Sequence, residues 1–484
     1  MNERSGQTSQ KTKASNGQDT VTIAERFAPF ADRMRAENLP QIVIRTFEHY
    51  YIRLLEGQTG LIAESEIRSV ESLPDADSLP DHLADTGERA LQKTVLMKLN
   101  GGLGTSMGLE RAKSLLRIKG ELTFLDVIAH QAREAGVPLV LMNSFNTRED
   151  SLGALQRYPW LEEQEVPLDF LQHKIPRIVQ ETLEPVTWAD DRELEWCPPG
   201  HGDIYTALVT SGMLDTLLAE GYEYVFVSNA DNLGAALDLK ILGYFAEERL
   251  PFMMEVADRT EADRKGGHLA QTTEGQLILR ESAQCPTQDM DAFQDVRRHR
   301  YFNTNNLWLH LPSLRRVMDE RDNLLGLPMI RNEKTVDPRD ATTTPVYQLE
   351  TAMGSAIGVF EGAGALRVPR ERFTPVKTTD DLLAVRSDAF VLTDDHRIVA
   401  NPDHKGGDLV VELDSNFYRL VDQLEQRFPH GPPSLVRCRR FEVMGDVRFG
   451  RDVVARGIVR VMNERRVQAT IDDGRQLSGA IHFS

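Results

Sequence analysis

Apolar positions in the middle of the chain alternate between two periods, one typical of buried strands and one typical of amphipathic helices. Three short apolar runs predict strands, at residues 94–99 (TVLMKL), 138–142 (PLVLM) and 222–228 (YEYVFVS). Between them, one helical pattern runs through Phe124 and Ile128 to Gly136, and a second, longer one runs from Asp203 to Gly221. This alternation predicts an α/β fold with a mostly parallel central sheet that is covered on both faces.

The N-terminal part of the chain has a different pattern. From residues 21 to 67, apolar side chains such as Phe47 and Leu54 recur at helical spacing, which predicts a helical region. Residues 72–85 are rich in Pro, Asp and Ser and are interpreted as a linker. Residues 1–20 contain almost no apolar side chains, so we expect them to form a disordered tail.

Near the C-terminus the apolar positions follow a six-residue period, at Phe441, Val447, Val453 and Val459. Neither a helix nor a plain strand repeats at this interval, whereas a hexapeptide β-helix places one inward apolar residue on each short side of its coil. The pattern therefore predicts a C-terminal β-helix. The alternative is a pair of ordinary β-hairpins.

The composition describes an acidic globular protein. Its 484 residues and 54.6 kDa correspond to about three domains, and 40% hydrophobic residues suffice for a sizeable core. The net charge of −18 argues against a surface for nucleic acid or for an anionic membrane. Three scattered cysteines form neither a disulfide framework nor a zinc motif, and no signal peptide or membrane-spanning run is visible. We therefore expect a cytoplasmic protein with reduced thiols.

The most informative polar segment, residues 98–108 (KLNGGLGTSMG), follows the first predicted strand. Glycines in such a turn leave backbone N–H groups exposed, and these groups can hold phosphate oxygens. The spacing matches neither a Walker A loop nor the Rossmann GxGxxG motif, and a tight turn without a ligand is the alternative. The next lysine, Lys113, is placed to reach back over the loop.

Two further polar segments contain candidate chemistry. In residues 196–203 (WCPPGHGD), His201 stands between two glycines at a helix start, where it can donate to a phosphate or hydroxyl; an exposed histidine in a capped loop is the alternative. In residues 227–235 (VSNADNLGA), Asp231 follows a buried strand with no basic residue near it in the sequence. Bound Mg²⁺ would offset the cost of burying this carboxylate, and an Asx turn is the alternative.

These three segments are all expected at one edge of the sheet, because ligands bind at the carboxyl ends of strands in open α/β sheets. A glycine loop, a lysine, a histidine and a carboxylate together suit phosphoryl chemistry on a nucleotide, which requires a cluster of cations. The candidate cations are Lys98, Lys113, Lys174, Arg177, Lys265 and Lys377.

Seven motifs, in this order, resemble the eukaryotic-type UTP–glucose-1-phosphate uridylyltransferases, also called UDP-glucose pyrophosphorylases. They are KLNGGLGTSMG, LMNSFNT, PPGHGDIY, VSNADNLGA, FNTNNLW, QLETAMGSAIG and PVKTTDDLL, within about residues 90 to 460. The resemblance implies a Rossmann-like nucleotidyltransferase domain between a helical N-terminal part and a C-terminal left-handed β-helix. The chain then divides into a tail (1–20), a helical region with linker (21–90), a catalytic domain (91–385) and a C-terminal domain (386–484).

The resemblance also implies roles for individual residues. UTP would be bound by Leu99, Asn100, Gly101, Gly102, Lys113, Gln172, Gly200, Asn229, Asp231 and Lys377. The sugar phosphate would be bound by His201, Asn229, Gly267, Glu281, Asn303, Asn305 and Asn306, the last three in a loop on the sugar side. Gln172 would read the uracil edge, Asp231 would ligate Mg²⁺, and Lys113 and Lys377 would be the catalytic lysines.

The implied reaction converts UTP and glucose 1-phosphate to UDP-glucose and pyrophosphate. The sugar-phosphate oxygen would attack the α-phosphorus in line with the leaving group, so that catalysis is positioning plus charge neutralisation by Mg²⁺ and lysines. One departure stands out: Ala112 occupies the place where the family usually has a proline before the lysine. Without the proline we expect a more relaxed backbone at Lys113.

Three alternative functions remain open from the sequence. One is a uridylyltransferase for N-acetylglucosamine 1-phosphate or for a broad range of sugar 1-phosphates, although FNTNNLW (302–308) and the short chain favour glucose. Another is a non-catalytic UDP-sugar sensor, which would not need Lys113, Asp231 and Lys377 together. An NAD-dependent dehydrogenase is disfavoured because the loop lacks GxGxxG. An exposed β-helix edge also predicts a homo-oligomer.

Overall fold

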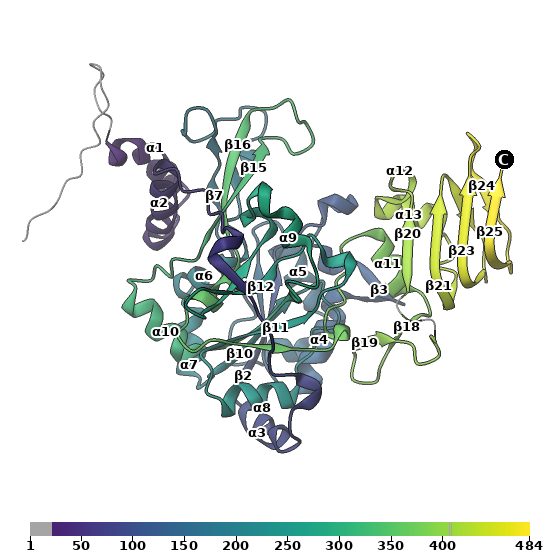
Figure 1. Ribbon diagram of the computed structural model, residues 1–484, viewed down its shortest axis with the longest axis horizontal. Helices are drawn as coiled ribbons and strands as arrows, with labels where there is room; N and C mark the ends of the chain where they lie inside the picture. Colours follow the sequence, from purple (N-terminus) through teal and green to yellow (C-terminus); the bar gives the residue numbers. More distant parts are fainter. Residues whose placement is uncertain (1–21, 406, 408) are drawn as a thin grey trace, which may run out of the picture.

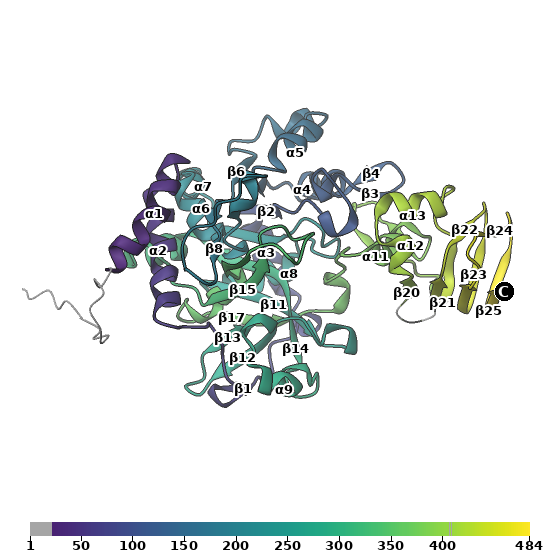
Figure 2. The ribbon, with the colours of Figure 1, turned by 90° about the horizontal axis from the view of Figure 1, so that it is seen from above.

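The computed structural model describes residues 22–405, 407 and 409–484, so the tail predicted at 1–20 lies outside the described residues. Two views show helices α1 (Ile23–Ala36) and α2 (Gln41–Leu55) at one end of the molecule and the C-terminal strands at the opposite end, with a large sheet between them (Figures 1 and 2). Within the described part of the chain, no helix has the length and apolar character needed to cross a membrane.

A ten-stranded mixed sheet forms the centre of the molecule. Its main path, in spatial order, is β1 (Ile67–Ser69), β12 (His268–Thr272), β14 (Tyr301–His310), β10 (Tyr224–Asn229), β2 (Thr94–Asn100), β5 (Leu139–Asn143) and β6 (Asp169–Leu171). Beside this path lie β11 (Phe252–Asp258), β13 (Leu277–Arg280) and β17 (Gly364–Arg367). The strands predicted at 94–99, 138–142 and 222–228 are confirmed as β2, β5 and β10.

The prediction of a mostly parallel sheet is wrong. Strands β10, β2, β5 and β6 are parallel to one another, but β14 runs antiparallel to β10, β11 and β12. The direction of a strand depends on where the chain re-enters the sheet, and an apolar run reads the same in either direction. The sheet is therefore mixed, with a parallel centre.

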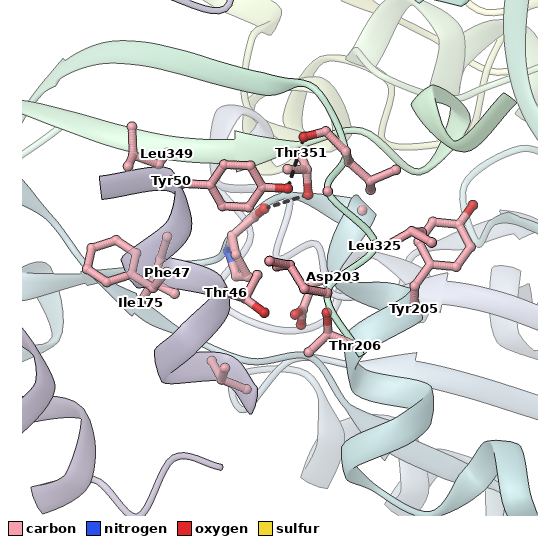
Figure 3. Close-up of a pocket in the computed structure, with 16 residues that line it drawn as sticks. Thr46, Phe47, Tyr50, Ile175, Asp203, Tyr205, Thr206, Leu325, Leu349 and Thr351 are labelled. Atoms are coloured by element: carbon pink, nitrogen blue, oxygen red, sulfur yellow. Dashed lines mark hydrogen bonds between the residues drawn. The ribbon is translucent and has the colours of Figure 1, made fainter. Parts of the chain in front are cut away.

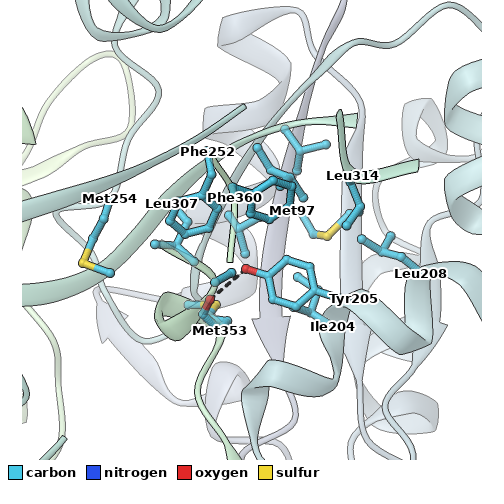
Figure 4. Packing of buried hydrophobic residues seen from close by; sticks show 14 of the residues in the cluster. Met97, Ile204, Tyr205, Leu208, Phe252, Met254, Leu307, Leu314, Met353 and Phe360 are labelled. Carbon is cyan, nitrogen blue, oxygen red and sulfur yellow. Dashed lines mark hydrogen bonds between the residues drawn. The ribbon is translucent and has the colours of Figure 1, made fainter. Parts of the chain in front are cut away.

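Helices cover both faces of this sheet because successive strand residues point to opposite sides. Val95 and Met97 of β2 pack with α6, α7 and α10, whereas Leu96 between them packs with α3, α4 and α8. Figure 4 shows part of the first cluster, in which Met97, Tyr205 and other apolar side chains interdigitate. The helices are α3 (His82–Leu91), α4 (Phe124–Ala135), α6 (Ile204–Thr210), α7 (Met213–Ala219), α8 (Leu239–Glu247) and α10 (Leu311–Glu320).

The long helix predicted from Asp203 to Gly221 is interrupted. It consists of α6 and α7, separated at Gly212, whose φ of 75° lies in the left-handed region that favours glycine. The helical pattern continues across the break because both short helices bury residues on the same core. By contrast, α4 ends at Gly136 as predicted, with a φ of 65° at that glycine.

The helical N-terminal region is confirmed, and α1 and α2 pack together through Phe27, Phe30, Phe47 and Tyr51. The segment predicted as a linker, 72–85, is only partly irregular, because α3 begins at His82. The part before α3, which includes a short 3-10 helix at Ala76–Ser78, is held against β17 by an arginine of that strand, which pairs with two aspartates: Arg367 with Asp75 and Asp77.

The C-terminal strands form parallel ladders, as the six-residue period predicts. The four residues of that period, Phe441, Val447, Val453 and Val459, are all buried, and Phe441 pairs with Val459, so one turn of the coil spans three steps of the repeat. Ordinary hairpins are excluded here because their strands would be antiparallel. The strands are β20 (Val410–Leu413), β21 (Ser434–Met444), β22 (Val447–Phe449), β23 (Val454–Asn463), β24 (Ala469–Ile471) and β25 (Gln476–Phe483).

The remaining elements are short and connect these layers. Small ladders are formed by β3 (Arg117–Lys119) with β4 (Leu122–Thr123), β7 (Ile175–Pro176) with β9 (Trp196–Cys197), and β18 (Phe390–Leu392) with β19 (Ile398–Ala400). A further sheet contains β15 (Met329–Thr335), β16 (Pro345–Thr351) and β8 (Ile178–Val179). The other helices are α5 (Arg148–Leu155), α9 (Met290–Gln294), α11 (Thr379–Arg386), α12 (Ser415–Tyr418) and α13 (Val421–Arg427). The three cysteines are buried, unbridged thiols, as expected.

Candidate active site

A cavity of about 300 Å³ opens where the parallel strands β2, β5 and β10 end. Its lining includes every residue predicted to bind UTP except Lys377, and also His201: Leu99, Asn100, Gly101, Gly102, Lys113, Gln172, Gly200, His201, Asn229 and Asp231. The structure thus brings the three polar segments of the sequence to one edge of the sheet. It adds lining residues that sequence reasoning missed, namely Ser114, Met142, Pro198 and Ala230. Their only signal was adjacency to residues already singled out.

The glycine loop is held by side chains behind it. The amide of Asn100 is buried and donates to Asn143 Oδ1 at 2.7 Å and to Ser151 Oγ at 2.8 Å, so its two side-chain N–H groups are not available to a ligand. Behind the next residue, Ser144 Oγ donates to the carbonyl oxygen of Gly101 at 3.0 Å. These bonds fix the loop before any ligand arrives, which lowers the entropy cost of binding.

Gln172 lies beside the glycine loop in the wall of the cavity, and a hydrogen bond from its side-chain amide holds it there. Its Nε2 donates to the carbonyl of Gly200 at 3.0 Å, and its Oε1 would lie 2.9 Å from a Cβ placed on Gly101. Gly200 has a φ of 80°, and a Cβ there would collide with the backbone of Thr351. Glycine is therefore required at position 200 to bring the His201 segment this close to Thr351, whereas a Cβ at position 101 would displace only the end of the flexible Gln172 side chain.

His201 is held in one tautomer. Its Nδ1 accepts a hydrogen bond from the backbone N–H of Met353 at 2.9 Å, so the ring proton resides on Nε2. Met353 is itself fixed by Tyr205, whose hydroxyl donates to the Met353 carbonyl at 2.8 Å (Figure 4). Burial lowers the pKa of His201 to about 4. The imidazole is therefore neutral near pH 7 and offers the cavity an N–H donor.

Lys113 and Asp231 form an ion pair inside the cavity, with Nζ and Oδ2 2.6 Å apart. The expectation that Asp231 lacks a basic partner is wrong, because its partner is remote in sequence. The lysine is aimed by its own backbone, whose N–H donates to the Gly102 carbonyl at 3.1 Å. Ala112 has a φ of −51°, within the range of proline, so the backbone keeps a proline-like conformation without the ring.

Lys377 lies next to this cavity without lining it. Its side chain is exposed, its ammonium lies 5.6 Å from the centre of the Phe373 ring, and it borders a separate hollow of about 290 Å³ that also contains Ser106 and Met107 of the glycine loop. The two sites are adjacent, since the N–H of Val376 donates to the Asp231 carbonyl at 3.1 Å. The two predicted catalytic lysines therefore approach the loop from different sides.

Two sets of residues predicted to face the sugar do not line the 300 Å³ cavity: Gly267 with Glu281, and the three asparagines at 303, 305 and 306. Gly267 and Glu281 face each other, with Glu281 Oε2 2.5 Å from a Cβ placed on Gly267, and burial raises the pKa of Glu281. Asn303 Nδ2 donates to Asn305 Oδ1 at 2.9 Å. Asn303, Asn305 and Asn306 belong to β14 at a register shift opposite β11, not to a loop as predicted. In the sequence, the run of asparagines looks like a loop because its partner strand, β11, lies far away along the chain.

Asn306 is a further correction. Its side chain is completely buried and donates to Glu255 Oε2 at 3.0 Å. It is therefore not exposed on the sugar side as predicted and contacts the residues behind the site. Three candidate cations are also used elsewhere. Lys98 is buried and donates to Ser228 Oγ at 2.6 Å, and burial lowers its pKa to about 7. Lys174 pairs with Glu37, and the buried Arg177 donates to backbone carbonyls.

Lys265 is exposed on the segment before Gly267, outside the 300 Å³ cavity. Of the six candidate cations, only Lys113 and Lys377 therefore remain beside the glycine loop.

A second cavity lies behind the His201 segment, between α2 and residues 202–206 (Figure 3). Its volume of about 40 Å³ holds a few waters at most, since each needs some 10–15 Å³. Apolar side chains such as Phe47, Leu325 and Leu349 line much of it. It is too small for a nucleotide, and none of the predicted site residues lines it.

Comparison with known proteins gives concordant results. A family model described as UTP–glucose-1-phosphate uridylyltransferase matches residues 44–456. The UTP–glucose-1-phosphate uridylyltransferase of Hordeum vulgare is 40% identical over 438 residues, which cover 88% of this chain and 90% of that protein. The enzyme of the same name from Saccharomyces cerevisiae is 40% identical over 399 residues, covering 81% and 78%.

Solved structures agree with these matches. The chain is similar to a variant of UDP-glucose pyrophosphorylase from Leishmania major in complex with UDP-glucose, with 45% identity, a TM-score of 0.88 and coverage of 95% of this chain and 100% of that one. It is also similar to a UDP-glucose phosphorylase from Trypanosoma brucei, with 43% identity, a TM-score of 0.85 and coverage of 95% and 100%.

Proposed function

The chain belongs to the UTP–glucose-1-phosphate uridylyltransferase family, and from this premise we propose that its reaction takes place in the 300 Å³ cavity at the ends of β2, β5 and β10. The enzyme makes UDP-glucose from UTP and glucose 1-phosphate. One observation carries the assignment of the cavity: it gathers a preformed glycine loop, a fixed amide at Gln172, a neutral histidine and the Lys113–Asp231 pair.

On the nucleotide side, the uracil edge lies against the amide of Gln172, which is held beside Gly101 and Gly200. The backbone of residues 99–102, with Gly200 and Asn229, surrounds the nucleoside and its phosphates. Lys113 reaches the triphosphate from the far end of the loop. Because the loop, Gln172 and Gly200 are fixed by one another, these groups are in place before UTP binds.

On the sugar side, the neutral His201 donates its Nε2 proton to the phosphate of glucose 1-phosphate, and Glu281, Asn303 and Asn305 face the sugar hydroxyls. An oxygen of that phosphate attacks the α-phosphorus of UTP, and the bond from this phosphorus to the bridging oxygen of the pyrophosphate breaks in line. No protein nucleophile is required. Lys113 and Lys377 neutralise the charge that develops, the first on the loop and the second beside it.

The carboxylate of Asp231 suits a Mg²⁺ ion. Among the described residues no cluster of three His, Cys, Asp or Glu side chains could bind a metal alone, which fits a cation that takes one or two carboxylates and completes its shell with phosphate oxygens and water. When bound, Mg²⁺ would withdraw charge from the phosphates. Asp231 would hold it, and the Lys113 ammonium would then turn from Asp231 toward the triphosphate.

Measurement of pyrophosphate release tests this proposal. We expect turnover with UTP and glucose 1-phosphate in the presence of Mg²⁺, with little turnover with ATP, CTP or GTP and a strong loss in EDTA. Substitution of Gln172→Ala should weaken discrimination among nucleotides, since this amide reads the base. Equal rates with all four nucleotides in the unaltered protein would contradict the placement of Gln172.

Sugar selectivity is tested with the same assay. We propose a preference for glucose 1-phosphate over N-acetylglucosamine 1-phosphate, and comparable kcat/KM values for the two would replace it by the broad-range alternative. We also propose that the C-terminal coil is left-handed, that the domains divide at residues 90 and 385, that the protein is cytoplasmic and that copies associate through the coil.

A further inference from the structure

The side chain of Asn232, next to Asp231, uses its full hydrogen-bonding capacity inside the protein. It is 5% exposed. Its Oδ1 accepts from the N–H of Thr374 at 2.9 Å and of Gly234 at 3.2 Å. Its Nδ2 donates to Asn306 Oδ1 at 3.0 Å and to the carbonyl of Arg372 at 3.1 Å. One amide therefore joins the turn after β10, the strand β14 and the segment that precedes Lys377.

A buried ion pair between Glu255 and Arg372 is joined to this amide through Asn306. The carboxylate of Glu255 is completely buried and accepts two hydrogen bonds from Arg372, at 2.7 and 2.8 Å. It also accepts from Trp308 Nε1 at 2.9 Å and from Asn306 Nδ2 at 3.0 Å. Such a fully satisfied network is rigid, because movement of any member would leave a buried charge unpaired.

The network clamps the turn that contains Asp231 against the segment that contains Lys377. Arg372 Nη2 donates to the Ala236 carbonyl at 2.9 Å, and Lys98 Nζ donates to the Ala235 carbonyl at 2.9 Å, so two side-chain donors hold the far end of the turn. Backbone pairing joins the near ends, with the N–H of Leu233 donating to Thr374 and that of Val376 donating to Asp231. Lys377 follows Val376 directly.

We propose that Asn232 is a positioning residue that, through this network, fixes the spacing between Lys377 and Asp231. It does not line the 300 Å³ cavity or the hollow beside Lys377, so it acts only through its neighbours. This inference rests on the proposed catalytic role of Lys377. Misplacement of a reacting or charge-stabilising group by about 1 Å can cost about 100-fold in rate, so loss of the amide should lower kcat more than it alters substrate binding.

A double-mutant cycle between Asn232→Ala and Lys377→Ala tests the proposal. In the otherwise unaltered enzyme, we expect Asn232→Ala to lower kcat for pyrophosphate release by roughly 10- to 100-fold while the KM values for UTP and glucose 1-phosphate change by less than about 3-fold. In the Lys377→Ala background, the same substitution should change kcat by less than about 3-fold, because the group it positions is already gone.

The matched control is Asn463→Ala in the C-terminal coil. Asn463 is 7% exposed, donates to the carbonyls of Asp446 at 2.6 Å and Val467 at 2.9 Å, and accepts from the N–H of Arg465 at 3.1 Å. Its loss should lower the thermal midpoint in a similar way but leave kcat within about 2-fold, since it lies far from the site in the fold. If Asn232→Ala does not fold, Arg372→Lys replaces it in the cycle, because this change keeps a cation opposite Glu255 and removes the planar double contact.

Three results would overturn the proposal, and they are distinguishable. If kcat of Asn232→Ala stays within about 2-fold of the unaltered enzyme, the amide positions nothing. If its full effect on kcat persists in the Lys377→Ala background, the amide acts through some group other than Lys377. If Lys377→Ala itself retains near-normal kcat, the catalytic role of Lys377 fails first, and the positioning role fails with it.

Discussion

The two lysine-bearing regions beside the glycine loop are built in opposite ways. Lys113 is mostly buried, with 14% of its side chain exposed, and its charge is already compensated by Asp231 at 2.6 Å. Lys377 is exposed beside an aromatic ring, and no ion pair joins it to any carboxylate among the described residues. The charge of Lys113 is paired inside the cavity. Lys377 keeps its charge unpaired and is held through its backbone, which follows Val376 and whose own N–H donates to Asp381 Oδ2 at 2.8 Å.

This difference indicates separate tasks. A paired lysine adds little net positive charge to an anionic ligand until its carboxylate partner is engaged by something else, which is the part proposed for Mg²⁺ at Asp231. An unpaired lysine keeps its net positive charge, although water screens that charge while the side chain is exposed, and its backbone must place it within reach of the phosphates. The position of Lys113 depends on its own contacts. That of Lys377 depends on the bond from its backbone N–H to Asp381 and, as proposed, on the network of Asn232, Glu255 and Arg372.

The largest expected effect is that of Lys377→Ala. Loss of one preorganised charge at a developing anion costs about 10²- to 10³-fold in kcat, and we expect a drop of this size with an unchanged thermal midpoint. Lys113→Ala should lower kcat less, because the ammonium that it removes is already paired with Asp231 and adds little net positive charge. Steady-state pyrophosphate release measures both. Lys240→Ala, which removes an exposed lysine paired with Asp81, is the control and should leave kcat unchanged. A smaller loss in Lys377→Ala than in Lys113→Ala would reverse the assignment of tasks.

Asp231→Asn should have the next largest effect. The substitution preserves shape but removes both the counter-charge of Lys113 and the proposed Mg²⁺ ligand, so kcat should fall by roughly 10- to 100-fold. The concentration of Mg²⁺ at half-maximal rate should rise as well. Titration of the rate with Mg²⁺ checks this, with Asp81→Asn at the exposed Asp81–Lys240 pair as the control. An unchanged Mg²⁺ requirement in Asp231→Asn would show that the metal is held elsewhere.

The pH dependence of stability gives a smaller effect, centred on His201. Burial lowers the pKa of this histidine from 6.5 to about 4, so between these values the unfolded chain binds a proton that the folded one does not. The contribution of His201 to stability is therefore complete above pH 6.5 and is lost as the pH falls toward 4. Chemical unfolding at several pH values should show a steeper loss below pH 6.5 in the unaltered protein than in His201→Asn. Parallel curves would mean that His201 is solvated and protonates normally.

Ala112→Pro should give the smallest effect. The φ of −51° at Ala112 already suits proline, so the ring should restrict mainly the unfolded chain. We expect the free energy of unfolding to rise by about 0.4–1 kcal/mol, with kcat unchanged. Denaturant unfolding measures the change. A destabilised protein would show that the closely packed surroundings of Ala112 leave no room for the ring.

Features encoded by neighbouring residues could be predicted from the sequence. The strands β2, β5 and β10, the end of α4 at Gly136 and the six-residue period of the coil all follow from local spacing. The polar segments were found for the same reason, because each directly follows a strand or opens a helix. Knowing that ligands bind at strand ends was then enough to expect these segments at one edge.

Features that depend on distant partners could not be predicted. The sequence predicts no cation for Asp231 because Lys113 lies far away along the chain. It predicts Asn306 beside the sugar because nothing local shows that this side chain is buried against Glu255. Lys98 illustrates the same point, since its place in a strand does not reveal that it donates to Ser228 and does not line the 300 Å³ cavity. The antiparallel direction of β14 likewise depends on the path of the chain.

A crystal structure of the unaltered protein with UDP-glucose would test the central claim most directly. We predict that the uracil edge lies within hydrogen-bonding distance, about 3 Å, of the Gln172 amide, and that the phosphates lie between the backbone of residues 101–102 and Lys113. The glucose should face Glu281 and Asn303. Density for the nucleotide anywhere other than the cavity at the ends of β2, β5 and β10 would contradict the account.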